Sequence, residues 1–238
     1  MDYQTVMAEL KRSGTAQARK IYARHGVRGD QFGVSYAVLG RMKKQIKTDH
    51  ALAVALWASG NHDARVLATM VADPEQIDLR LATAWSKDLD NYGLSDALAG
   101  LLAKSPKVRD RFARWTKSKN EWLGVLGYGI LNRRALDIDT PEDEIVNDQV
   151  LAGYIAEIEK SIHGRPNRTR HAMNMALVAI GVRNPRLQKL ALEAAKRIGK
   201  VEVDHGQTSC QTPDAAVYIK KTLAHRQRAR RLIKVRSC

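Results

Sequence analysis

The most regular pattern of apolar and polar positions lies in residues 56–96, where three short amphipathic helices are predicted in succession. Asn61 and Asp73 are good N-caps, and Pro74 suits a first helical position, so we expect helices to begin near residues 62 and 74. Asp96 lies in the third helix, off its apolar stripe. The stripes consist of Leu67, Met70 and Val71 in the first helix, Ile77, Leu81, Ala84 and Trp85 in the second, and Leu94, Ala97, Leu98, Leu101 and Leu102 in the third.

Proline placement extends the helical pattern along the chain. Five of the six prolines directly follow a capping residue, and each pair predicts a helix start: Asp73-Pro74, Ser105-Pro106, Thr140-Pro141, Asn184-Pro185 and Thr212-Pro213. The starts are about 30 to 45 residues apart, the length of a helical hairpin in a HEAT-type array. The alternation at residues 201–203 is too short to predict a sheet. We therefore expect an all-α fold, an α-solenoid of HEAT-like repeats in a single domain over residues 1–238, with residues 226–238 as a flexible basic tail.

The net charge of +15 is concentrated at the two ends of the chain. Residues 1–47 contribute +7 and residues 196–238 contribute +8, whereas the residues between them are neutral. Closely spaced cations favour a polyphosphate partner, because each neutralised phosphate releases a counterion. They are Arg41, Lys43, Lys44 and Lys47 near the start, and Arg226, Arg228, Arg230, Arg231, Lys234 and Arg236 near the end. The alternative is that these residues only solubilise exposed helices.

Other protein classes fit the composition poorly. Uncharged runs reach about half of the ~20 residues that a membrane helix needs, so no membrane partner is expected. The first residues do not resemble a secretory signal, and two cysteines make neither a disulfide framework nor a zinc site. We expect a cytoplasmic monomer. Asp204, His205 and Cys210 lie close together in residues 201–215, where a loop is the favoured interpretation and a local metal or thiol function the alternative.

Several segments together resemble the AlkD-type DNA alkylation repair family. They are LWASGNHDAR at 56–65, the Asp-Pro helix start after it, Trp85 to Asp96, Asn-Glu-Trp-Leu at 120–123 and RTRHAMNMALVAIGVRNP at 168–185. The resemblance covers roughly residues 35–200. It implies a right-handed superhelix of HEAT-like helix pairs whose basic, concave face holds double-stranded, damaged DNA.

The resemblance also implies a DNA glycosylase. Members of the family hydrolyse the N-glycosidic bond of cationic purines such as 3-methyladenine and 7-methylguanine without a metal or cofactor. Asp96 matches the catalytic aspartate, and Tyr92, one turn earlier, matches an aromatic residue beside the sugar of the lesion. A carboxylate there would stabilise the oxocarbenium ion that forms as the base leaves. The DNA-binding candidates are Arg41, Lys43, Lys44, Arg168, Arg170, His171 and Met175.

Four positions depart from the pattern of the family. Tyr92 and Met175 stand where tryptophans are usual, and Val125 and Val178 stand where active members carry arginines. Two alternatives therefore stay open: a non-catalytic protein that binds damaged or branched DNA by its shape, and a protein–protein scaffold. Four tryptophans are expected to pack in the core, with Trp85 the best candidate for an exception, and His62 is expected at the surface.

Overall fold

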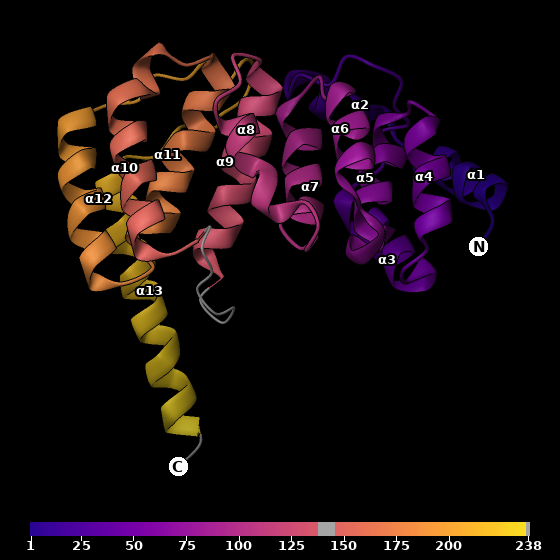
Figure 1. Ribbon diagram of the computed structural model, residues 1–238. Coiled ribbons are helices and arrows are strands. Elements are labelled where there is room, and N and C mark those ends of the chain that lie inside the picture. Colours follow the sequence, from indigo (N-terminus) through magenta and orange to yellow (C-terminus); the bar gives the residue numbers. More distant parts are fainter. Residues whose placement is uncertain (138–145, 237–238) are drawn as a thin grey trace. The chain divides into compact units, whose positions relative to one another are not determined.

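The protein is built from helices. The computed structural model describes residues 1–137 and 146–236, without the side chains of residues 110 and 229–236, and over this part of the chain it contains no strand (Figure 1). The α-helices are α1 Tyr3–Ser13, α2 Ala16–Arg24, α3 Tyr36–Ile46, α4 His50–Ala58, α5 His62–Val71, α6 Leu79–Lys87, α7 Tyr92–Leu102, α8 Phe112–Thr116, α9 Glu121–Leu136, α10 Asp148–Ser161, α11 Asn167–Gly181, α12 Pro185–Ile198 and α13 Ala215–Arg236. Short 3-10 helices occupy Pro74–Gln76, Arg109–Arg111 and Ile162–Gly164. The all-α prediction is confirmed.

The contacts divide the chain into two compact units. The first contains Met1–Ile130 and His205–Cys210, and the second contains Leu131–Asp204 and Gln211–Cys238. In the first unit α4 packs on α5, and α5 packs in turn on α3 and α7. In the second, α12 packs on α10 and α11, and α13 packs on α11 and α12. The prediction of a single domain, with a flexible tail from residue 226, stays a prediction.

Local capping explains where most helices begin. Asn61 accepts hydrogen bonds from the backbone N–H groups of Asp63 and Ala64, and Asn91 accepts one from Leu94. Asn184 accepts a bond from Leu187 N at 2.9 Å, with proline at the first helical position. Such caps satisfy donors that the first helical turn leaves without an intrahelical partner. The predicted starts at residues 62 and 185 are therefore confirmed.

The predicted helix from residue 74 is wrong in its length and its buried face. Pro74 opens only a 3-10 turn, after which the backbone of Ile77 is extended and its side chain is fully buried. Asp78 then caps α6 by accepting a hydrogen bond from Leu81 N at 2.7 Å. This second cap starts a new helix, so a different set of side chains faces the core. Its buried residues are Ala82, Trp85 and Ser86, in place of the expected stripe through Leu81 and Ala84.

Two other proline pairs lie near helix starts without forming them. After Ser105-Pro106 the chain makes turns that lead to Arg109–Arg111 and α8, while the Ser105 hydroxyl donates to the Ile77 carbonyl oxygen at 2.9 Å. The helix expected at Thr212 begins two residues later, because Asp214 supplies the cap to Val217 N at 2.8 Å. The pair Thr140-Pro141 and the side chains of the basic residues after Arg228 lie outside the described residues.

A buried carboxylate organises the connection between α2 and α3. Asp63 is 1% exposed and accepts hydrogen bonds from three successive backbone N–H groups, Phe32 at 2.6 Å, Gly33 at 3.0 Å and Val34 at 2.8 Å. Gly33 has φ of +76°, and a Cβ there would lie 2.6 Å from the Thr15 carbonyl oxygen. Only glycine fits this conformation and this space. Asp63 thus fixes the path of the chain into α3.

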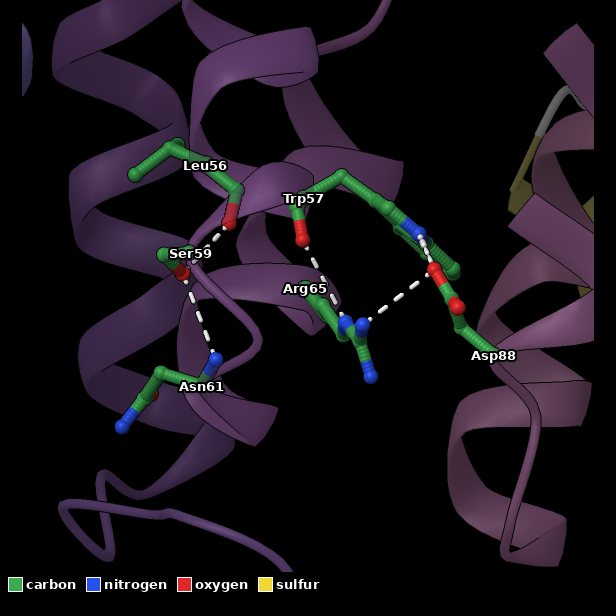
Figure 2. A network of polar contacts seen from close by, with 6 residues as sticks. All are labelled: Leu56, Trp57, Ser59, Asn61, Arg65 and Asp88. Carbon is green, nitrogen blue, oxygen red and sulfur yellow. Dashed lines mark hydrogen bonds and ion pairs between the residues drawn. The ribbon is translucent and has the colours of Figure 1, made fainter. Parts of the chain in front are cut away.

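A second polar network connects α4, α5 and the end of α6 (Figure 2). Asp88 accepts a hydrogen bond from Trp57 Nε1 at 2.8 Å and forms an ion pair with Arg65 at 3.2 Å. Arg65 Nε also donates to the Trp57 carbonyl oxygen at 3.3 Å. The Trp57 ring stacks on Trp85 with 4.3 Å between centroids, and both residues are 3% exposed. Trp85 is therefore a packing residue and not an exception to the expected packing of the tryptophans.

Candidate nucleic-acid interface

Helix α7 presents Asp96 to solvent. Leu94 and Leu98 are buried on one side of the helix, and Ser95 is also buried, with its hydroxyl donating to the Asn91 carbonyl oxygen at 2.9 Å. Asp96 lies off this buried face and is exposed, as its position off the apolar stripe predicts. Tyr92 is one turn earlier and half-buried. The structure therefore places both predicted catalytic residues on one helix, with the carboxylate accessible.

The Tyr92 hydroxyl is held by a residue that the sequence analysis did not identify. It forms a hydrogen bond with Nδ1 of His25, and the two rings meet edge to face with centroids 6.0 Å apart. Which group donates depends on the histidine tautomer. The two residues are 67 positions apart in the chain, so no local pattern predicts their contact. His25 positions the Tyr92 ring beside Asp96.

Tyr36 at the start of α3 is a further aromatic residue near this carboxylate. Its side chain is 50% exposed. Burial of the rest of the side chain, and then the negative charge of Asp96 together with Tyr92 and Asp63, raise the pKa of Tyr36. The phenol is thus neutral at physiological pH. An exposed carboxylate and electron-rich rings form a surface suited to a cationic group.

The cationic candidates of the first unit lie on the same helix as Tyr36. Arg41, Lys43 and Lys44 are exposed on α3, whereas Leu39 and Met42 pack into the core. Arg41 lies about 7.5 Å along the helix axis from Tyr36, given a rise of ~1.5 Å per residue. Among the described residues, no carboxylate lies within ion-pair distance of these three cations. Their charge is therefore available to an external anion.

The candidates on α11 belong to the second unit and are less accessible. Arg168, Arg170, His171 and Met175 are all half-buried. His171 Nδ1 shares a hydrogen bond with the Thr212 hydroxyl at 2.9 Å, and the Met175 carbonyl oxygen accepts one from Asn132 at 2.9 Å. Arg170 Nη2 approaches Asn167 Oδ1 at 3.5 Å. These residues contribute to the packing of α11, and their contact with DNA stays a prediction.

Two departures from the family pattern are buried in the core. Val125 on α9 is 3% exposed and Val178 on α11 is 4% exposed. An arginine side chain could not remain charged in these positions without a route to water or a partner. Val125 and Val178 thus contribute apolar packing at these positions. The first unit presents the exposed cations of α3 and the exposed Asp96 of α7.

The structure corrects the placement of His62. It is 7% exposed, and its ring meets the edge of Tyr22 at 5.8 Å between centroids. Burial, with a smaller contribution from the positive charge of Arg65, lowers the pKa of His62, while Asp63 and Asp90 oppose the shift. Its backbone N–H donates to the Asp30 carbonyl oxygen at 2.8 Å. His62 is part of the connection to α3, because that loop covers the start of α5.

Residues 201–214 form an irregular connection between α12 and α13. The Asn167 side chain anchors it by two bonds of 2.7 Å to the backbone N–H and carbonyl of Asp204. Further along, the Thr208 hydroxyl donates to the His205 carbonyl oxygen at 3.0 Å and accepts from Cys210 N at 3.3 Å. In the parts of the chain with defined positions, no three metal-ligating side chains come together. No helix in these described parts of the chain is long and apolar enough to cross a bilayer.

Comparison with known proteins agrees with this architecture. One solved structure matches this chain with a TM-score of 0.84 and 29% sequence identity, and the match covers 94% of this chain and 95% of the other chain. That structure is of a new family of proteins related to the HEAT-like repeat DNA glycosylases with affinity for branched DNA structures. Uncharacterised proteins of Listeria innocua and Listeria monocytogenes are each 27% identical over 220 residues, covering 90% of this chain and 93% of theirs. The family model described as DNA alkylation repair enzyme matches residues 6–219. The chain therefore belongs to the DNA alkylation repair enzyme family and has its HEAT-like helical fold.

Proposed function

We propose that the protein acts in DNA repair by binding damaged or branched duplex DNA through its phosphates. The observation that carries this proposal is the exposed cationic face of α3, where Arg41, Lys43 and Lys44 have no carboxylate partner among the described residues. Affinity for branched DNA in the family of the structural relative supports it. The buried valines at residues 125 and 178 favour binding over catalysis, because they remove two cations that active members carry.

Binding of this kind selects DNA by shape. Phosphate contacts fix position and orientation without reading the bases, so sequence preference is expected to be small. A junction or a bend brings phosphates of two arms close together, and a basic surface gains from this density. The preference for branched over linear DNA should therefore be largest when the α3 cations are intact.

A matched pair of triple variants tests the proposal. Arg41→Glu, Lys43→Glu and Lys44→Glu together should weaken binding of a four-way junction strongly and flatten its salt dependence. The control combines Lys104→Glu, Lys107→Glu and Lys117→Glu, which are also exposed in the first unit and change the net charge equally. Equal losses in both variants would show that only net charge matters. Binding of the wild type that is insensitive to salt would favour the protein–protein scaffold.

Base excision by Asp96 is the second candidate function. The observation that favours it is an exposed carboxylate one turn from Tyr92 and electrostatically coupled to Tyr36. In a purine alkylated at N3 or N7 the glycosidic bond breaks with its electron pair going to the cationic base, which leaves neutral. Asp96 would stabilise the oxocarbenium ion, and water would then add to C1′ and lose a proton.

Single-turnover release of 7-methylguanine from methylated duplex DNA distinguishes the two functions. Asp96→Asn should abolish release and leave DNA affinity equal or higher, because one negative charge is removed from the interface. Glu75→Gln provides the control, since Glu75 is exposed in the same unit and loses the same charge. Equal release by wild type and Asp96→Asn, or none by either, removes Asp96 from the mechanism and leaves the binding function.

A further inference from the structure

A cavity of about 430 Å³ lies in the second unit, between the end of α11, the first turn of α12 and the middle of α13. Figure 1 shows these helices packed against one another. Gly181 permits the close approach of α13, because a Cβ there would lie 2.6 Å from Ile219 Cδ1 and 2.8 Å from Ala191 Cβ. The volume falls within the range of ~300–1,000 Å³ that is typical of small-molecule sites.

The described charged residues that line the cavity are all basic. Arg183, Lys220 and Arg226 contribute cations, and none of the described lining residues is acidic. Arg226 Nη1 donates to the carbonyl oxygen of Val182 at 2.9 Å, at the C-terminal end of α11, so its guanidinium is held in place. Lys220 is exposed and has no ion-pair partner among the residues with defined side chains. This arrangement favours an anionic ligand.

The start of α12 adds to the positive potential. Asn184 and Pro185 line the cavity and are the N-cap and first residue of this 14-residue helix. A helix N-terminus carries a partial positive charge from its aligned peptide dipoles. Asp148, the carboxylate that contacts this cap, accepts a hydrogen bond from the Asn184 side chain at 2.8 Å and faces Arg186 at 4.0 Å. Its charge is thus partly neutralised.

The remaining wall of the cavity is mixed, with apolar side chains beside the amides of Gln188 and Gln227. Val182, Leu223 and Ala224 line it beside the cations, together with the ring of Pro185. A phosphate ion alone would leave this wall in contact with water. A ligand that joins an anionic group to a flat apolar group would bury both kinds of surface. A nucleotide has this composition.

We propose that the cavity binds one unpaired nucleotide of a DNA strand, with its phosphate at Lys220 and Arg226 and its base against Leu223 and Ala224. This inference rests on the proposed DNA-binding function and extends it to the second unit. Forks, flaps and frayed ends supply unpaired nucleotides without the cost of breaking a base pair. A site for one such nucleotide gives the protein a contact that continuous duplex DNA cannot make.

The direct test uses thymidine 5′-monophosphate and the full-length protein, followed by calorimetry and by NMR shifts. Lys220→Glu should weaken binding by about tenfold or more, because it replaces a phosphate contact by a repulsion. Lys221→Glu is the matched control, since Lys221 is exposed, adjacent on α13 and absent from the lining. Ala224→Trp should also abolish binding by filling the apolar side without a change of charge. Equal affinities in wild type, Lys220→Glu and Lys221→Glu would overturn the proposal, as would no binding by the wild type.

A second test separates this inference from the proposed function. A splayed-arm fork and a duplex with a single-stranded 5′ extension, each carrying a fluorescent adenine analogue at the first unpaired position, report base contact directly. The fluorescence change should occur in wild type and Lys221→Glu, and be lost in Lys220→Glu and Ala224→Trp. Tight DNA binding with no fluorescence change in the wild type or in any variant would overturn the cavity assignment alone. Absence of DNA binding, with nucleotide affinity still dependent on Lys220, would instead overturn the proposed function.

Discussion

Two aspartates in the first unit, Asp63 and Asp96, have opposite environments. Asp63 is 1% exposed and accepts three backbone hydrogen bonds from a loop about 30 residues earlier in the chain. Asp96 is exposed on α7, next to Tyr92 and near Tyr36. Both aspartates lie in segments that carry the family resemblance, Asp63 in 56–65 and Asp96 in Trp85 to Asp96. A segment that resembles a family can therefore hold a support of the fold as well as a residue suited to chemistry.

The physical basis of the difference is burial, because the Asp63 carboxylate is enclosed with three backbone donors whereas Asp96 is exposed. Removing the charge of Asp63 leaves buried N–H donors without an adequate acceptor, which costs free energy of folding. Asp96 is exposed, so its substitution changes no buried charge. Substitution of Asp63 should therefore lower stability, whereas substitution of Asp96 should change activity and leave stability nearly unchanged.

The largest expected effect follows from Asp63→Asn. The amide has one acceptor oxygen for three donors, so we expect the free energy of unfolding to fall by about 3 kcal/mol or more. Denaturant unfolding followed by circular dichroism measures it. Asp63→Asn with near wild-type stability would contradict the structural role and remove the contrast with Asp96.

A smaller effect is expected at Asp88, which binds Trp57 and Arg65 through one oxygen (Figure 2). Its side chain is 41% exposed, so solvent screens the ion pair. We expect Asp88→Ala to lower the free energy of unfolding by about 1 kcal/mol. Asp88→Asn should lose less, because its amide oxygen still accepts from the indole N–H. Equal losses would assign the effect to the charge and not to the hydrogen bond.

A pH-dependent effect is expected from His62, beside Asp63. Its pKa is lowered by burial, so below the unfolded value of about 6.5 the unfolded chain binds a proton that the folded chain does not. The free energy of unfolding therefore decreases as pH falls, by at most about 1.4 kcal/mol per pH unit from this group.

Denaturant unfolding at pH 7 and pH 5 measures the contribution of His62. His62→Phe keeps a ring against Tyr22 and should reduce the loss of stability at the lower pH. His225→Gln is the control, because His225 is exposed on α13 and should leave the pH dependence unchanged. The same pH dependence in His62→Phe as in wild type would show that other groups cause it.

The smallest effect on stability is expected from Asp96→Asn. The residue is exposed on a helix whose buried face does not include it, so the free energy of unfolding should change by less than about 0.5 kcal/mol. The same denaturant experiment measures this change. A large loss of stability would show that Asp96 supports the fold, and the contrast with Asp63 would disappear.

Helix content, most capping and the outward position of Asp96 follow from the sequence alone. These features depend on groups within one or two helical turns, such as Asn61 with Ala64, Asn91 with Leu94 and the apolar stripe of α7. Short-range geometry is the same wherever the helix packs. The break at Ile77 was missed because two capping residues, Asp73 and Asp78, compete within five positions, and burial of Ile77 selects the second for the α-helix.

Contacts between distant segments were decided only by the tertiary structure. His25 and Tyr92 are 67 residues apart, Asp63 binds a loop about 30 residues away, and the basic cavity joins residues 182–188 to residues 220–227. None of these contacts produces a periodic pattern in the sequence, because the distance between the contacting residues is set by how whole helices pack. Periodicity in a sequence thus reports which face of a helix is buried, whereas only packing decides which residues meet across the helices.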